Sequence, residues 1–451
     1  MKIKIVSIIL IFSVLGFRKT LEASEFEWKI GVAEIDITPN EQMWMAGYGM
    51  RNKESEGMLH PLRAKCLFFE DGFGTRSILI TTDLLAIPRE LSLKLKEAVF
   101  NAYHIPKSHV LINSSHTHTG PVLSNSLLDI YPLDEKKYNK VESYTNSLSE
   151  KLIKLVDSAE KDLEPAKLYS GNGVSRIQVN RRNNKESEVE NLSELKGPND
   201  FAVPVFRVET LSGKVKAIAF GYACHATVLN TYEWSGDYPG FAQLELEKLY
   251  PEAVALFFQG AGGDQNPLPR GSVDLAKQYG KSLAASVERV LNEKMDLLSA
   301  KFMASYDEIS LPLEESPSLE ELEKLRDNNS GYVERWSSRL ISQMEEGEAF
   351  DTEYVHYPIQ SWSLGRQLLI ALGGEVTVEY AVKLKERLGH DLFVLGYSND
   401  VMNYIPSEKI LEEGGYEGKQ AHIVYGLPSK WKSGIEERII RSTVALTKIM
   451  K

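Results

Sequence analysis

Two histidines at the end of an expected strand are the first residues in this sequence whose types and spacing could do chemistry. His116 and His118 follow the apolar, β-branched run 110–112 and precede a Gly-Pro pair that stops a strand. Side chains two apart on a strand point to the same face, so we expect both imidazoles to project together. Such a pair suits a metal site or a general base, and it is equally typical of a hydrogen-bonded surface turn.

Two further segments place polar residues at the ends of expected strands. Strands at 203–209 and 215–222 form a predicted hairpin, and His225 follows the second. A single histidine among apolar residues is more often a satisfied core residue than a ligand. The glycine-rich run 259–267 carries Asp264 and Asn266; its glycines permit close approach of a ligand, or simply a flexible loop.

The last third of the chain adds a carboxylate and a phenol. A strand at 368–372 is broken by two glycines, and a helix is predicted from Glu375 to Leu388. Glu375 then lies in the first turn, where the helix dipole favours an ionised carboxylate. A strand at 392–395 leads to a polar segment that contains Tyr404. This segment is equally typical of an ordinary turn at the end of a strand.

Alternating strands and helices must position these residues. The patterns predict strands at 30–37, 62–69, 77–82 and 253–258, and helices at 88–102, 144–160 and 241–249. This alternation favours an α/β fold, with mixed β-sheets flanked by α-helices in a single large domain. The polar run 184–200 is expected to be a surface loop. The charged run 318–348 is predicted to be largely helical, and we assign it no chemistry.

Composition sets the class of protein. The chain has 451 residues, 43% of them hydrophobic, and a formal net charge of -11. An acidic chain without a basic stripe is not expected to bind nucleic acid. Only Cys66 and Cys224 are present, so no disulfide framework is expected, and the sequence leaves open whether the two meet.

The amino terminus resembles an export signal. Lys2 and Lys4 precede an apolar run at 5–17, and Ala23 closes a small-residue cleavage site. We therefore predict a signal peptide at 1–23, a mature domain at 24–451, and a periplasmic, cell-surface or secreted location. The basic pair at 18–19 leaves an uncleaved membrane anchor as the alternative.

A series of short polar and glycine-containing runs extends from residue 30 to about 420: GVAEIDITP, MAGYG, SSHTHTGP, VNRRN, ACHATVL, SGDYPG, GGDQNP, GGEVT and MNYIPS. Taken together and in this order, these runs resemble the catalytic domain of the neutral, non-lysosomal ceramidases. The family consists of zinc amidohydrolases that cleave the amide of ceramide. The resemblance implies zinc ligands at His116, His225, Glu375 and Tyr404, and places His118 and Arg181 near the substrate.

The expected chemistry agrees with these residue types. Two imidazoles, a carboxylate and a phenolate suit zinc, and an open coordination position would make the site catalytic. Zinc lowers the pKa of a bound water toward neutrality and polarises a carbonyl. His118 is expected to be the base or an oxyanion donor, and Asp237 or Asp264 to orient an imidazole.

Two departures from the family pattern bear on the substrate. Where the family has a Gly-Asp-x-Ser-Pro loop, this chain has Asn266 in place of the serine. An amide cannot act as a hydroxyl nucleophile, but it can donate a hydrogen bond to a carbonyl. The chain also ends at Lys451, without the C-terminal immunoglobulin-like domain expected of typical members.

We therefore expect an exported zinc amidohydrolase that acts on ceramide or another amphiphilic N-acyl compound, with peripheral contact to a membrane. The expected catalytic residues are His118, Arg181, Asp264 and Asn266. An esterase or an N-acyl sugar deacylase on the same site is the rival hypothesis. A non-catalytic binder of lipid or glycan is less compatible, because four buried polar groups are costly to keep together without a ligand.

Overall fold

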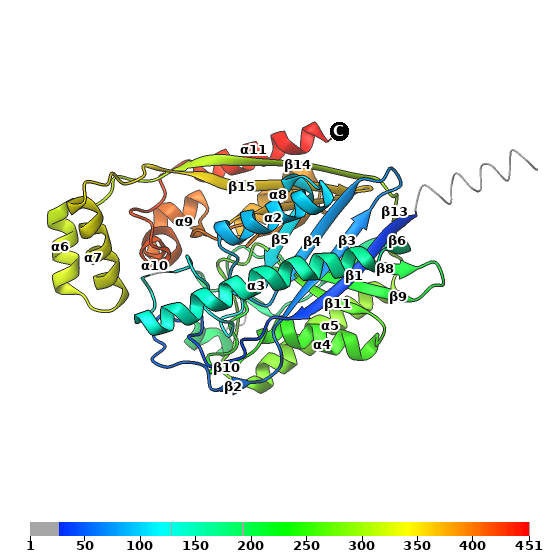
Figure 1. Ribbon diagram of the computed structural model, residues 1–451, viewed down its shortest axis with the longest axis horizontal. Coiled ribbons are helices and arrows are strands. Elements are labelled where there is room, and N and C mark those ends of the chain that lie inside the picture. Colours follow the sequence, from blue (N-terminus) through cyan, green and yellow to red (C-terminus); the bar gives the residue numbers. More distant parts are fainter. Residues whose placement is uncertain (1–26, 128, 192–193, 451) are drawn as a thin grey trace, which may run out of the picture.

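Four layers of secondary structure make up the molecule (Figure 1). The computed structural model describes residues 27–127, 129–191 and 194–450, so the signal peptide expected at 1–23 lies outside the described residues. Two β-sheets pack face to face in the middle, and helices cover the outer face of each sheet. The α/β fold with mixed sheets flanked by helices is confirmed.

The larger sheet has nine strands, ordered β11-β9-β8-β6-β1-β3-β4-β5, with β13 beside β6. The strands are β1 (Trp28–Asp36), β3 (Arg63–Glu70), β4 (Arg76–Thr82), β5 (Val110–Ser114), β6 (Glu164–Val174), β8 (Ala202–Thr210), β9 (Val215–Tyr222), β11 (Val254–Gln259) and β13 (Asp296–Leu298). Its two edge strands meet at their carboxyl ends, because Asn113 of β5 both donates to and accepts from the backbone of Gln259 of β11. The sheet therefore curls, and the segments after β5 and β9 come together.

Alternating side chains of this sheet serve two cores. In β3, Cys66 and Phe68 face the helices, while Leu67 and Phe69 face the second sheet, and all four are buried. The helices on the outer face are α2 (Arg89–Tyr103) and α3 (Glu135–Lys161) over one end, and α4 (Asp237–Leu249) and α5 (Val273–Asn292) over the other. Because both faces are covered, the strands read as nearly continuous apolar runs.

The second sheet has four strands, β14 (Phe302–Pro312), β15 (Glu353–Leu364), β16 (Gln367–Leu372) and β18 (Phe393–Leu395). One face packs on the larger sheet through residues such as Trp362, Leu369 and Phe393. The other face is covered by α8 (Val378–Leu388) and α11 (Ile435–Ile449). Isolated bridges from Asn113 to Ser398 and from Gly260 to Leu395 join the two sheets near their strand ends.

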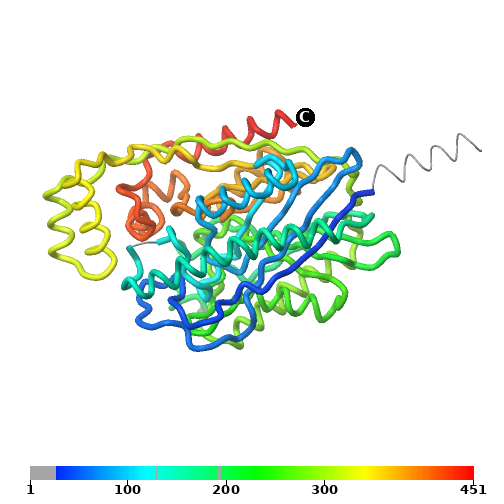
Figure 2. Tube along the Cα trace, viewed as in Figure 1, coloured from blue at the N-terminus to red at the C-terminus, as the bar shows by residue number. Residues whose placement is uncertain are grey.

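A helical hairpin projects from the far end of β14 and β15 (Figures 1 and 2). It consists of α6 (Leu319–Asn328) and α7 (Tyr332–Glu345), and Ser318 and Glu321 form a capping box at its start. The helices predicted in the charged run are confirmed, with Leu322 facing the hairpin's own small core. We assigned this run no chemistry from the sequence, but the start of α7 lines a cavity described below.

Short strand pairs, α9 (Glu408–Glu413) and α10 (Ala421–Tyr425) complete the described chain. The pairs are β2 (Gly57–Met58) with β10 (Glu233–Trp234), β7 (Gln178–Asn180) with β12 (Gln265–Pro267), and β17 (Glu375–Val376) with β19 (Tyr404–Ile405). Cys66 and Cys224 are both buried and free. No helix in the described part of the chain has the length and hydropathy needed to cross a membrane.

Candidate metal centre

The segments after β5 and β9 bring the three histidines together. His116 lies two residues after β5, and His225 lies three residues after β9. The ring nitrogens of His116, His118 and His225 that could bind a metal all lie within 4.8 Å of one another, and all three residues are buried. The curling of the sheet, fixed by Asn113 and Gln259, is what closes the distance between the two strand ends.

The prediction that His116 and His118 share one face of a strand is wrong. β5 ends at Ser114, and His116 has a φ of 61°, in the left-handed region that non-glycine residues rarely adopt. Backbone bonds from Ser115 to Thr82 and from His116 to Leu84 hold this turn. The two imidazoles still converge, with 3.1 Å between their Nε2 atoms, because the turn folds His118 back onto His116.

Glu375 and Tyr404 reach the site from a two-stranded parallel pair. The helix predicted from Glu375 instead begins at Val378, so Glu375 is in β17 and the helix-dipole argument for it fails. Tyr404 is its registered partner on β19, and neighbouring residues in register project to the same side. Glu375 Oε2 lies 3.1 Å from His116 Nε2 and 3.0 Å from His225 Nε2, and Tyr404 Oη lies 3.1 Å from His225 Nε2.

Backbone carbonyls determine which nitrogen each imidazole presents. His116 Nδ1 is 2.8 Å from the carbonyl oxygen of Leu85, and His225 Nδ1 is 2.8 Å from that of Gly262. A carbonyl only accepts, so each Nδ1 carries the proton and each Nε2 presents a lone pair in the neutral ring. Both lone pairs face the carboxylate of Glu375.

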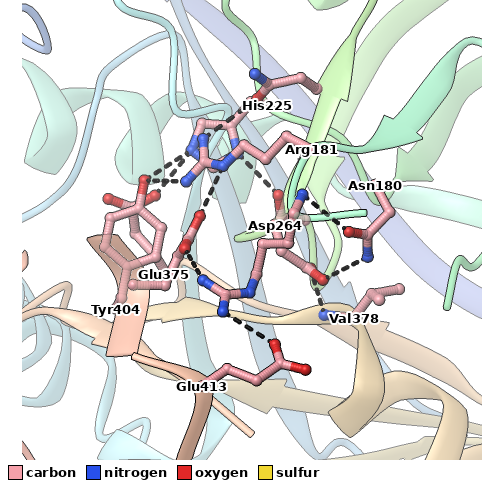
Figure 3. A network of polar contacts seen from close by, with 12 residues as sticks. Asn180, Arg181, His225, Asp264, Glu375, Val378, Tyr404 and Glu413 are labelled. Carbon is pink, nitrogen blue, oxygen red and sulfur yellow. Dashed lines mark hydrogen bonds and ion pairs between the residues drawn. The ribbon is translucent and has the colours of Figure 1, made fainter. Parts of the chain in front are cut away.

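The expectation that Asp237 or Asp264 orients an imidazole is wrong. Asp237 accepts hydrogen bonds from the backbone of Val228, Leu229 and Tyr238. Asp264 accepts from the Val378 backbone and from the Asn180 amide, at 2.8 Å in both cases (Figure 3). Asp264 thus joins the β7–β12 pair to the start of α8, and it acts on the site through the backbone.

Burial and charge set the protonation states. Burial opposes ionisation of Glu375, but His116 and His225 outweigh it and hold the pKa of this carboxyl well below its usual range. Burial lowers the pKa of His225 to about 4, and burial with the neighbouring imidazoles lowers the pKa of His118 well below its usual value. The site therefore presents an ionised carboxylate beside the neutral imidazoles of His118 and His225 at neutral pH.

This donor set fits a metal ion. Two imidazole lone pairs and a carboxylate oxygen crowd within 3.0–3.1 Å, an arrangement that is repulsive without a cation between them. Ligands about 2.0–2.1 Å from zinc in a tetrahedron are separated by roughly 3.3 Å, close to these spacings. Tyr404 and His118 lie at hydrogen-bond distance from His225 and His116, so each is placed to be a further ligand.

The sequence did not indicate the groups that hold Glu375. Tyr397 donates to Oε2 at 3.2 Å, and Tyr425 donates to Oε1. Tyr397 belongs to the GYSNDV run, but a phenol that reaches back to a carboxylate 22 residues away has no local signal. Gly47 was also missed as a site residue: a Cβ there would lie 2.4 Å from His118 Cγ.

Arg181 connects the ligands to the loop that carries Asn266. Its guanidinium donates to Glu417 at 2.8 Å and to Asn266 Oδ1 at 3.2 Å. It also donates to Tyr404 Oη at 3.1 Å (Figure 3). Arginine only donates, so the amide oxygen of Asn266 faces Arg181 and its NH₂ group faces elsewhere. Burial raises the pKa of Tyr404, against the lowering effect of Arg181.

Two cavities adjoin these residues. The larger has about 990 Å³ and is lined by Tyr48, whose ring packs 4.7 Å from that of His118. The smaller has about 420 Å³ and is lined by Arg181, Asn266 and Tyr416, and the Tyr416 ring packs 5.3 Å from that of Tyr404. Both cavities share Tyr416, Glu186 and Arg270, so they are neighbours of ligand size, and each is separated from the metal centre by one tyrosine ring.

Residues 28–284 match the family model of the neutral/alkaline non-lysosomal ceramidase N-terminal domain. This match covers more than half of the chain. The chain belongs to the neutral/alkaline non-lysosomal ceramidase family. Neutral ceramidase A of Dictyostelium discoideum is 26% identical over 272 residues, 55% of this chain and 37% of that protein. Neutral ceramidase of Pseudomonas aeruginosa is 23% identical over 263 residues, 54% of this chain and 38% of that protein.

Solved ceramidase structures share the fold across nearly the whole chain. The crystal structure of neutral ceramidase from Pseudomonas aeruginosa has a TM-score of 0.71 at 18% identity, covering 94% of this chain and 75% of that chain. A structure described as ceramidase complexed with C2 gives a TM-score of 0.71 at 17% identity, covering 94% and 76%. The sequence matches span less than two fifths of the curated relatives' length.

Proposed function

We propose that this family member hydrolyses the amide bond of ceramide or a related N-acyl compound, with zinc as the metal. The observation that carries the proposal is the convergence of two imidazole lone pairs on an ionised carboxylate, beside ligand-sized cavities. The similarity to neutral ceramidases supports the reaction class. Because the aligned part is a fraction of those relatives, the substrate remains part of the proposal.

His116, His225 and Glu375 would hold the metal, with Tyr404 as the fourth ligand. When bound, zinc with an open position supplies a nucleophilic water near neutral pH and polarises the substrate carbonyl. Tyr397 and Tyr425 hold both oxygens of Glu375, so the carboxylate is preorganised before any metal arrives.

His118 is the group assigned to move a proton. Its Nε2 lies beside the ligand cluster, and its lowered pKa keeps it unprotonated and able to accept at neutral pH. Tyr48 packs on its ring and Arg51 donates to its backbone carbonyl at 2.8 Å, which fixes the position of the residue. Gly47 leaves the space that the ring occupies.

Arg181 and Asn266 are assigned to the substrate carbonyl. With its oxygen held by Arg181, Asn266 has its NH₂ group available to donate to an oxygen in the smaller cavity. This role requires no nucleophilic hydroxyl at position 266, so the reaction is compatible with asparagine where the family has serine. Asp264 contributes indirectly by holding the β7–β12 pair that presents both residues.

An amphiphilic substrate suits the larger cavity, which combines tyrosines with apolar side chains such as Ile130 and Val424. Met50 at its rim is 95% exposed, which favours contact with a lipid surface during loading. We assign the protein to an exported location through residues 1–23. Amino-terminal sequencing of the mature protein tests this, with Ser24 as the expected first residue.

Hydrolysis tests the reaction class. Purified protein with zinc is incubated with an N-acyl amide and with the ester of the same acyl chain, and released fatty acid is measured. Amide hydrolysis that is abolished by a chelator and restored by zinc is the expected result. Hydrolysis of the ester alone would favour the esterase alternative, and binding without hydrolysis of either would favour a lipid-binding protein.

A further inference from the structure

The two cavities beside the metal centre are cationic in a chain that is strongly acidic overall. The chain carries a formal net charge of -11. Yet the charged side chains that line these cavities are five arginines and two glutamates: Arg51, Arg181, Arg182, Arg270, Arg335, Glu186 and Glu417. A positively charged cavity in a negatively charged protein attracts and concentrates anionic ligands.

Three of these arginines already have carboxylate partners. Arg270 forms a two-bond pair with Glu186, at 2.7 and 2.8 Å. Arg181 and Arg182 both bind Glu417, at 2.8 and 2.7 Å. These pairs account for both lining glutamates, so the cationic excess rests chiefly on the two remaining arginines of the larger cavity.

Arg51 is a buried cation without a carboxylate partner in the described chain. It is 5% exposed, and its guanidinium donates to the carbonyls of Thr231 and His118, each at 2.8 Å, and to the sulfur of Met45. It lies over the rings of Tyr48 and Tyr232, and its Nε has no partner among the described residues. Burial without a counter-charge lowers its pKa.

Arg335, on the helical hairpin, is partly exposed and likewise has no carboxylate partner among the described residues. Its Nε and Nη2 donate to the carbonyls of Asp129 and Ile130, at 2.9 and 3.0 Å. Arg339, one turn further along α7, instead pairs with the Asp129 carboxylate at 2.7 Å. The hairpin thus keeps its neutralised arginine away from the cavity and directs the uncompensated one to the cavity wall.

A buried cation held only by carbonyls is unfavourable unless a ligand compensates it. A substrate with a neutral headgroup would leave both guanidinium groups uncompensated, whereas a carboxylate or sulfonate accepts the fork of hydrogen bonds that arginine offers. The backbone contact of Arg51 to His118 places it beside the centre, so the anion belongs a few bonds from the scissile amide.

Resting on the proposed amide hydrolysis, we infer that the preferred substrate carries an anionic group on its amine portion, bound by Arg51 and Arg335. The substrate class is a fatty acyl amide of an amino acid or aminosulfonate. The acyl chain has no charge to offer these arginines, so the anion must be on the part that leaves as the amine.

Binding of two matched amphiphiles tests this inference. N-lauroyltaurine and N-lauroylethanolamine share the acyl chain, the amide and a two-carbon spacer, and differ by a sulfonate in place of a hydroxyl. Isothermal titration below the critical micelle concentration should give the sulfonate a Kd at least roughly tenfold lower, as expected for a charge-assisted pair. Arg335→Gln should remove most of that preference.

Arg326→Gln is the matched control, because Arg326 lies on the same hairpin, pairs with Asp327 and does not line the cavity. Its preference should equal that of the wild type. If Arg51→Gln fails to fold, Arg51→Lys keeps the charge and loses the fork, and it should weaken the preference. Equal Kd values for the two wild-type complexes would overturn the inference.

Two further measurements, laurate binding and amide hydrolysis, show whether the headgroup assignment or the proposed hydrolysis is wrong. If laurate binds as tightly as N-lauroyltaurine and Arg335→Gln weakens both alike, the arginines hold the released acid, and the headgroup assignment is wrong. Hydrolysis of both amides is measured in parallel. Hydrolysis without a sulfonate preference leaves the proposed function intact and overturns this inference. A sulfonate preference without hydrolysis supports this inference and overturns the function.

Discussion

The two sheets contribute to the metal centre in different ways. The larger sheet supplies His116, His118 and His225 from turns that follow its strands, and two of these rings are oriented by backbone carbonyls. The smaller sheet's side of the molecule supplies Glu375 and Tyr404 from a short strand pair, and Glu375 is oriented by the hydroxyls of Tyr397 and Tyr425.

The histidine rings are thus oriented by the backbone, whereas the Glu375 carboxylate is oriented by side chains. A backbone carbonyl remains when side chains change, so the histidine geometry depends mainly on the fold of the larger sheet. The carboxylate depends on two phenols from distant segments and is open to tuning by substitution. The family model covers residues 28–284, the side with the histidines, while the structural similarity extends over both sides.

The largest expected effect comes from the backbone-controlled side. His225→Ala should remove nearly all bound metal, because it removes one of the two imidazole ligands that face the Glu375 carboxylate. Metal content per chain measures this. His109→Ala is the control, since His109 Nδ1 also bonds a carbonyl, that of Arg76 at 2.9 Å, but lies outside the cluster. A variant at His225 with wild-type metal content would remove this residue from the site.

The fourth ligand decides which side of the molecule completes the centre. We expect His118→Ala to lower kcat by roughly 10²-fold or more while metal stays bound. Tyr404→Phe should lower metal affinity instead. If His118→Ala empties the site and Tyr404→Phe does not, His118 is the fourth ligand in place of Tyr404, and the larger sheet supplies three of the four ligands.

Acid should protonate a partly buried histidine, His422, on the other side of the molecule. Burial lowers the pKa of His422 to about 4, and its ring packs on Trp336. A depressed pKa gives stability that is complete above the unfolded value near 6.5 and is lost as pH falls toward 4. The loss is about 3 kcal/mol, from a difference of roughly 2.5 pKa units.

His422→Phe should make the free energy of unfolding less dependent on pH between the unfolded pKa near 6.5 and pH 4. Denaturant unfolding of chelator-treated protein between pH 7 and pH 4 measures the change, and phenylalanine keeps the packing on Trp336. An unchanged pH dependence in the variant would show that His422 is not the group responsible.

The smallest expected effect on the centre is that of Asn266→Ser. The serine restores the hydroxyl typical of the family, so ceramide hydrolysis should be kept or raised while metal content stays the same. Metal content and fatty acid release report the two effects separately. Loss of metal would show that the Arg181–Asn266 contact supports the ligands, since Arg181 also binds Tyr404.

Local patterns predicted the elements well and the contacts between them less well. The hairpin of β8 and β9 was predicted from strand and turn residues, and α2 from its periodicity. The helix at Glu375 was misplaced because Glu375 pairs with Tyr404, a contact 29 residues away that propensity does not reveal. The same limit applies to Tyr425 and Arg51, whose roles arise only when distant segments meet.

The charged hairpin shows this limit most clearly. Its leucine spacing is local and predicted helices, but its contribution of Arg335 to a cavity depends on where the hairpin packs. Likewise, H-x-H spacing suggested convergence of His116 and His118 for the wrong reason, since a left-handed turn and not a strand brings them together.

Metal content of the native protein tests the central claim most directly. Protein purified without chelator is analysed for metals, and we expect about one zinc per chain, held at His116, His225, Glu375 and Tyr404. Absence of any stoichiometric metal, in protein that also fails to take up added zinc, would contradict the assignment of these residues as a zinc site.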